Sequence, residues 1–179
     1  MTVSVRRVAS LGLLTLFFGS SLVRGDERDG LPIMEKPLAQ PFLTGLVGAW
    51  ATESQGAFGP GKGSVQFRLG VGGTALIDDY ENFSGSGGKV VMTMHGMGIS
   101  KVSTDGQTLT RWWFDDQRGS ALVMSGGLTE LGWDISGHPN GDADTTARMK
   151  LEKTSQGLSV TLFANGHKVW AEKYKRVAK

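Results

Sequence analysis

Apolar and polar residues alternate along most of the chain from Leu46 onward, in short runs that end at glycine, asparagine or aspartate. Within 158–164, Leu158, Val160 and Leu162 fall on one face of an extended chain and the residues between them fall on the other. Residues 147–152 alternate in the same way. A period of two places one face of a strand in a core and the other in water, as antiparallel sheets allow. The pattern therefore predicts an all-β protein.

Segments of this kind recur at intervals of about 8–12 residues, which is typical of a sandwich or a barrel. Tight hairpin signals occur at Thr104-Asp105-Gly106 and at Asn165-Gly166, and Gly126-Gly127 is expected to join two strands closely. No segment of about ten residues has the period of a long helix. The predicted strands are 47–54, 62–69, 74–82, 89–101, 107–115, 120–125, 128–136, 145–154, 158–164 and 167–176.

A flat sheet of about ten strands would leave long exposed edges, and closing the sheet removes them. A barrel of this strand number can also hold a small interior cavity. The predicted fold is therefore a single antiparallel up-and-down β-barrel over residues 42–179. A sandwich of two sheets is the structural alternative.

The N-terminal residues 1–25 have the pattern of a secretory signal peptide. Two arginines precede an uncharged apolar segment, Leu11 to Val23, that is too short to span a bilayer comfortably. Cleavage is expected near Gly25, and a retained anchor helix is the alternative. The mature protein is thus expected to be exported, to the periplasm or outside the cell, and to have no membrane span.

Residues 26–41 are charged or interrupted by proline, which predicts an extended N-terminal tether, with a short helical turn at 41–47. The net positive charge of the chain comes from the residues that precede this tether. Three of the 19 Lys and Arg residues and none of the 17 Asp and Glu residues precede Asp26, which leaves 16 basic against 17 acidic residues after it. Without a clustered basic surface, nucleic acid is not an expected partner.

The absence of cysteine excludes disulfides and thiolate chemistry.

Five short motifs follow one another along the chain. A Gly-x-Trp sequence at 48–50 begins the series, and a Gly-Gly-x-x-Leu strand start follows at 72–76. Gly96-Met97-Gly98 leads into the turn at Asp105, and an aromatic strand then ends in Trp113-Phe114-Asp115. The last motif is the basic and aromatic strand at 172–176.

In this order the motifs resemble a bacterial family of secreted, lipocalin-like barrels of unknown function within the calycin superfamily. The resemblance covers roughly 42–177, and it implies a calycin barrel in which Trp50 plugs one end. One departure is Ser103-Thr104-Asp105, where the family usually has Tyr-Asp before the hairpin. The family has no catalytic signature to transfer, so the resemblance implies a fold and not a reaction.

The run from Met92 to Met97 contains three methionines and His95, and thioether and imidazole ligands suit copper. On a strand, however, Met92 and Met94 share one face, while His95 and Met97 share the other. The alternative is that the methionines fill an irregular interior. Some calycin barrels bind haem through one histidine, but Ala51-Thr52-Glu53 replaces the glycine-rich start of those barrels. No cofactor is therefore expected.

The adjacent Trp112 and Trp113 must face opposite ways on a strand. Thr110, Trp112 and Phe114 form one set, which looks like core by its polarity. Leu109, Arg111, Trp113 and Asp115 form the other set. If the set with Arg111 faces inward, Arg111 and Trp113 would form a polar-aromatic site for an anionic apolar ligand such as a fatty acid. If it faces outward, it is an ordinary amphipathic surface.

The neighbouring carboxylates at 78–79 and 115–116 also point to opposite faces, so neither pair is a catalytic dyad by itself. Asp78 and Tyr80 share a face and are better candidates for a cavity. The sequence favours an interior site for a small, apolar or amphipathic ligand. The alternatives are an enzyme that uses cavity carboxylates, a haem or copper barrel, and a structural barrel with a filled interior. The expected ligand-binding residues are Trp50, Asp78, Tyr80, Met92, Met94, Arg111 and Trp113.

Overall fold

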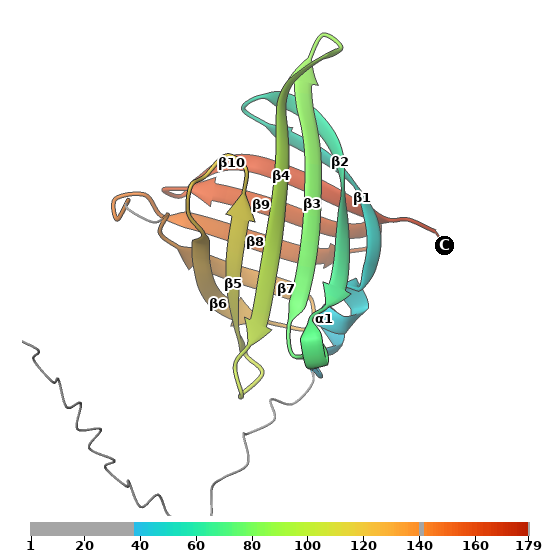
Figure 1. Ribbon diagram of the computed structural model, residues 1–179, viewed down its shortest axis with the longest axis vertical. Coiled ribbons are helices and arrows are strands. Elements are labelled where there is room, and N and C mark those ends of the chain that lie inside the picture. Colours follow the sequence, from blue (N-terminus) through green and yellow to red (C-terminus); the bar gives the residue numbers. More distant parts are fainter. Residues whose placement is uncertain (1–37, 140–141, 179) are drawn as a thin grey trace, which may run out of the picture. The chain divides into compact units, whose positions relative to one another are not determined.

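The computed structural model describes residues 38–178 with the exception of 140–141. Its strands form a closed antiparallel barrel, in which each strand pairs with its neighbours in sequence and β1 (Gly48–Gly56) pairs with β10 (His167–Arg176) (Figure 1). The all-β prediction is confirmed, and the barrel is favoured over the sandwich. The predicted signal peptide and most of the predicted tether lie outside the described residues.

The helices and strands of the described residues follow the predicted segments closely. None of the helices within 38–139 and 142–178 has the length and the apolar character that crossing a membrane requires. The remaining elements are α1 (Pro41–Leu46), β2 (Gly59–Leu69), the 3-10 helix η1 (Val71–Gly73), β3 (Leu76–Ser86), β4 (Lys89–Val102), β5 (Thr108–Asp115), β6 (Leu122–Leu128), β7 (Gly132–Gly137), β8 (Ala147–Thr154) and β9 (Gly157–Ala164).

Helix α1 covers one end of the barrel, which we call the closed end. Its first turn begins at Pro41, and the Gln40 side chain accepts a hydrogen bond of 2.8 Å from the Phe42 backbone N–H, which caps the helix. Leu43 and Leu46 are fully buried, and the Phe42 ring meets Trp133 edge-on at 6.1 Å. The helical turn predicted at 41–47 is therefore present, and it is held by apolar packing into the barrel.

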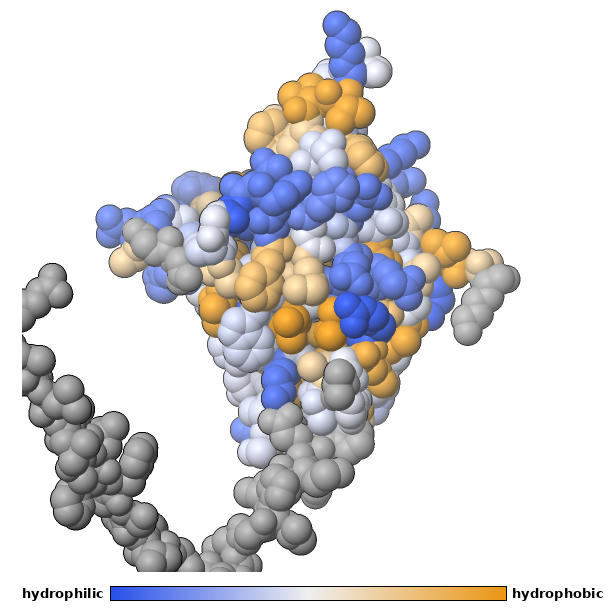
Figure 2. Space-filling model, in the orientation of Figure 1, coloured by the Kyte–Doolittle hydropathy of each residue, from blue (hydrophilic) through white to orange (hydrophobic). Residues whose placement is uncertain are grey.

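The opposite end, which we call the mouth, is bounded by the connections β1–β2, β3–β4, β5–β6, β7–β8 and β9–β10. The β3–β4 hairpin extends beyond the other strands at this end (Figure 1). Val90 and Val91 near its tip are 63% and 64% exposed, and Figure 2 shows hydrophobic residues gathered close to the tip. The mouth thus has no counterpart of α1 among the described elements.

The prediction that Gly126-Gly127 ends a strand was wrong. Strand β6 runs through both glycines to Leu128, and the connection to β7 follows at 129–131. A Cβ at Gly126 would collide with the carbonyl oxygen of Asp134 on the neighbouring strand β7. The glycine therefore permits close approach of two strands, and it does not mark a turn.

Candidate functional site

The inward face of β5 is the one that carries Leu109, Arg111 and Trp113. Arg111 is 2% exposed, whereas Phe114 on the other face is 40% exposed. The set that looked like core by its polarity is thus the outer surface. The charged face of β5 can point inward because the charge of Arg111 is neutralised inside the barrel by a buried acid.

Arg111 and Asp78 form a bidentate ion pair in the barrel interior. Arg111 Nη1 donates to Asp78 Oδ1 over 2.6 Å, and Nη2 donates to Oδ2 over 2.8 Å. Nη1 also donates to Ser100 Oγ over 3.1 Å. Both charged side chains are only 3% exposed. Asp78 thus already occupies the paired face of the guanidinium, so an anionic ligand at Arg111 would have to compete with it. Arg111 Nε makes no hydrogen bond with the described residues.

Gly98 makes room for this ion pair. It lies on β4 between the two strands that carry the charges, where a Cβ would collide with both Arg111 Nη atoms and with Asp78 Oδ1. Overpacking of a fixed interior is destabilising, because neighbouring groups must leave their preferred positions.

We expect Gly98→Ala to lower the free energy of unfolding by about 1–3 kcal/mol, because the added methyl group displaces the ion pair. Gly127→Ala is the matched control on β6, since nothing lies within 4 Å of a Cβ placed there. Urea unfolding followed by circular dichroism measures both variants. Equal stabilities of the two variants would contradict the packing around Gly98.

A second buried polar cluster lies nearer the mouth, along the wall formed by β10, β1, β2 and β3. Tyr80 Oη donates to Glu172 Oε1 over 3.0 Å, and Asn82 Nδ2 donates to the same oxygen over 3.4 Å. Asn82 Nδ2 also donates to Ser54 Oγ over 3.1 Å, and Ser84 Oγ donates to Asn82 Oδ1 over 2.7 Å. The cluster thus joins strands that are not neighbours in the barrel.

Glu172 is 3% exposed. Burial raises the pKa of Glu172 above its ordinary value, while the hydrogen bond from Tyr80 acts in the opposite direction. Burial and the nearby Glu172 carboxyl also raise the pKa values of Tyr80 and Tyr174, so both phenols stay protonated. In the part of the chain that the structure describes, no cation forms an ion pair with Glu172.

Most of the apolar inward-facing side chains around the mouth are half-buried, in contrast to the fully buried apolar side chains near α1. We call them the mouth ring. Trp113 is held in place by its Nε1, which donates to Asp115 Oδ2 over 2.7 Å, and by an edge-on contact of 5.7 Å with the Tyr80 ring. Its indole lies over Gly96, where a Cβ would collide with the ring. The mouth ring consists of Met92, Met94, Trp113, Met149, Leu162 and Trp170.

A depression of about 330 Å³ lies at the rim of the mouth, between the β5–β6 and β7–β8 connections. It is lined by residues 118–122 and Pro139. Among them, Leu122 belongs to β6, where it pairs with the inward-facing Trp113 on β5. The rim is therefore hollowed next to the inner wall of the barrel.

The structure brings most of the predicted ligand-binding residues to the interior. Asp78 and Arg111 form the deeper ion pair, Tyr80 joins the second polar cluster, and Met92, Met94 and Trp113 belong to the mouth ring. Trp50 lies instead at the closed end, where its Nε1 donates to the Leu46 carbonyl over 2.8 Å and Arg176 stacks on its ring at 4.5 Å. It is a core residue beneath α1, far from the mouth along β1.

Sequence reasoning missed Glu172, Asn82, Ser54 and Trp170. The 172–176 segment is a basic and aromatic strand in the sequence, and its basic residues outnumber its one acidic residue. Its alternation contained the signal, since Glu172 and Tyr174 share the face opposite to Lys173 and Lys175. A carboxylate on the same face as an aromatic residue, with two lysines on the opposite face, indicates an inward charge.

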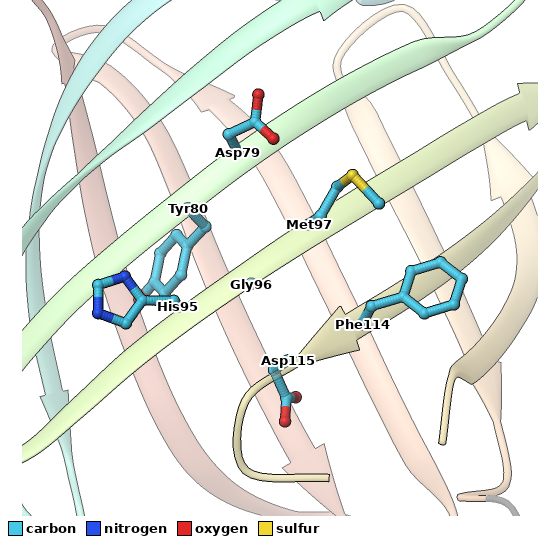
Figure 3. A pocket seen from close by; sticks show the side chains of 7 residues that line it. All are labelled: Asp79, Tyr80, His95, Gly96, Met97, Phe114 and Asp115. Atoms are coloured by element: carbon cyan, nitrogen blue, oxygen red, sulfur yellow. The ribbon is translucent and has the colours of Figure 1, made fainter. Parts of the chain in front are cut away.

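The outer surface of β4 and β5 carries the remaining candidate ligands. His95 and Met97 face outward there, with His95 Nδ1 3.6 Å from Glu81 Oε1. They flank a shallow depression of about 440 Å³ that also includes Asp79 and Phe114 (Figure 3). Within residues 38–139 and 142–178, no three His, Asp or Glu side chains lie close enough together to hold a metal ion.

The strand alternation thus separates the candidate ligands of the Met92–Met97 run, with Met92 and Met94 inside and His95 and Met97 outside. Apolar residues of this outer face are scattered among charged ones (Figure 2). In comparisons with known proteins, no family model matches the chain, and a search of curated proteins gave no match.

Proposed function

We propose that this barrel binds a small, largely apolar or amphipathic ligand through its mouth. The observation that carries the proposal is the difference between the two halves of the interior. Side chains near α1 are fully buried, whereas the apolar side chains of the mouth ring remain half-buried. Solvent therefore reaches an apolar inner surface, and a ligand that replaced this water would gain the free energy of apolar burial.

The inner wall of the mouth half has two chemically different sides. Met94, Trp113, Met149 and Leu162 form an apolar side on β4, β5, β8 and β9. Glu172, Asn82 and Ser54 form a polar side on β10, β3 and β1. Such a division suits an amphipathic molecule whose chain lies on the apolar side and whose polar end reaches the cluster.

The strand number supports this proposal. A barrel of about eight strands is just wide enough for its own side chains or for one small ligand, and the diameter grows with the number of strands. Export, which the N-terminal sequence predicts, would make the protein a carrier, scavenger or sensor outside the cytoplasm. The calycin-like family expected from the motifs would agree with such a role.

Leu162→Trp is expected to weaken the binding of decanol at least about tenfold, because the larger side chain fills the mouth. The matched control is Phe163→Trp, which places the same residue on the outer face of the same strand and should leave the affinity unchanged. Isothermal titration calorimetry with decanol measures both.

Three outcomes would contradict the proposal. The first is no binding of decanol, decylamine or decanoate to the unmodified protein, which would favour a barrel with a filled interior. The second is equal loss of affinity in both tryptophan variants. The third is loss in Phe163→Trp alone, which would place the ligand on the outer surface.

A further inference from the structure

Glu172 differs from the other buried acid of the barrel interior, Asp78. Asp78 has a guanidinium partner with two hydrogen bonds below 3 Å. Glu172 is equally buried, but its hydrogen bonds come from the neutral groups of Tyr80 and Asn82. A buried carboxylate without a cation is costly, because neutral donors replace only part of its hydration.

The surroundings of Glu172 contain a second polar group that bears on a ligand head. On β10, Glu172 lies between the deeper Tyr174 and Trp170 of the mouth ring. The Thr52 hydroxyl lies beside the carboxyl and counteracts the rise of the Glu172 pKa, and its oxygen accepts no hydrogen bond from the described residues, although Thr52 is only 2% exposed. A buried hydroxyl oxygen without a donor, next to an acid without a cation, indicates a position that an additional donor would complete.

We propose that the polar end of the ligand is a primary ammonium group, which pairs with Glu172 and hydrogen-bonds to Thr52. This inference rests on the proposed function and specifies its ligand class as aliphatic amines. Arg111 does not favour the opposite charge, because both of its Nη atoms already bond to Asp78. An ammonium group supplies three donors, which match the acceptor capacity of the carboxylate and the hydroxyl oxygen.

Three ligands with one chain and different heads test this assignment. Decylamine is expected to bind the unmodified protein about 10- to 100-fold more tightly than decanol, as a charge-assisted hydrogen bond implies. Decanoate is expected to bind most weakly. In Glu172→Gln the preference for decylamine over decanol should disappear.

Glu53→Gln is the matched control. Glu53 lies on the neighbouring strand β1, faces outward and sits 3.9 Å from Lys175 Nζ, so its replacement removes the same charge from the outside of the wall. It should leave the order of the three ligands unchanged. Circular dichroism verifies that each variant is folded.

The pH dependence provides an independent readout. Because its pKa is raised, Glu172 becomes protonated at a pH above the ordinary range of a glutamic acid. The affinity for decylamine should therefore fall as the pH is lowered through that raised pKa, whereas the affinity for decanol should not. The groups that face Glu172, Tyr80 and Tyr174, keep their protons there, and Asp78 is paired with Arg111.

The outcomes separate the two proposals. Binding of none of the three ligands would overturn the proposed function and this inference together. Binding of decanol with equal or weaker binding of decylamine would overturn only the inference and leave Glu172 a structural acid. A preference for decanoate would also overturn only the inference, and it would indicate that the ligand carboxylate contacts Arg111 Nε.

Discussion

Replacing Arg111 by methionine is expected to lower the free energy of unfolding by about 3–5 kcal/mol. Methionine keeps much of the length of the side chain but removes the charge that neutralises Asp78. The Asp78 carboxylate would then remain 2% exposed without its bidentate partner. Breaking one side of a buried ion pair costs more than the pair contributes, because the remaining charge keeps its desolvation penalty.

The neighbouring positions provide a matched control on the outer face of the barrel. Arg68 and Asp79 form an ion pair of 3.2 Å between β2 and β3, and both side chains are about half exposed. Arg68→Met should cost no more than about 1 kcal/mol, since water solvates the remaining charge. The double variant Arg111→Met with Asp78→Leu should recover much of the lost stability. Chemical denaturation measures all three, and equal effects of the two single variants would contradict the buried pair.

Truncation of Leu43 to alanine is expected to cost about 2–5 kcal/mol. Leu43 is fully buried where α1 enters the closed end, so the lost methyl groups leave a cavity against the barrel core. Because the short helix has few contacts of its own, its position depends on this packing. The amide protons at the start of β1 should also exchange faster with solvent in this variant.

Thr44→Ala provides the comparison within the same helix, since Thr44 is exposed and its hydroxyl bonds only to backbone carbonyls of the first turn. Its effect should stay within about 0.5 kcal/mol. Thermal unfolding of the two variants measures the difference. A Leu43→Ala protein as stable as Thr44→Ala would show that α1 does not close the barrel.

The strands and most hairpins could be predicted because their signals are local. Asn165 and Gly166 both adopt positive φ angles, as their hairpin turn requires. The alternation at 147–152 and 158–164 correctly placed the inward residues of β8 and β9. The closed barrel could be predicted from the number of strands, because closing a sheet of about ten strands removes its two exposed edges.

The errors arose where an interaction between distant residues overrides local polarity. Arg111 can face inward only because Asp78 lies two strands away, a fact that the sequence around Arg111 does not contain. Gly126 looked like a turn residue, yet it permits contact with a backbone oxygen of β7. Glu172 was missed for the same reason, since its partners Tyr80 and Asn82 lie about 90 residues earlier in the chain.

The most direct test of ligand binding in the mouth is a crystal structure of the protein grown with decylamine. The account predicts that the alkyl chain lies against Trp113 and Leu162, with the ammonium nitrogen within hydrogen-bond distance of Glu172. A ligand seated in the outer depression beside Met97 and Phe114 would contradict this account. So would a barrel whose mouth is filled by its own side chains and holds no ligand.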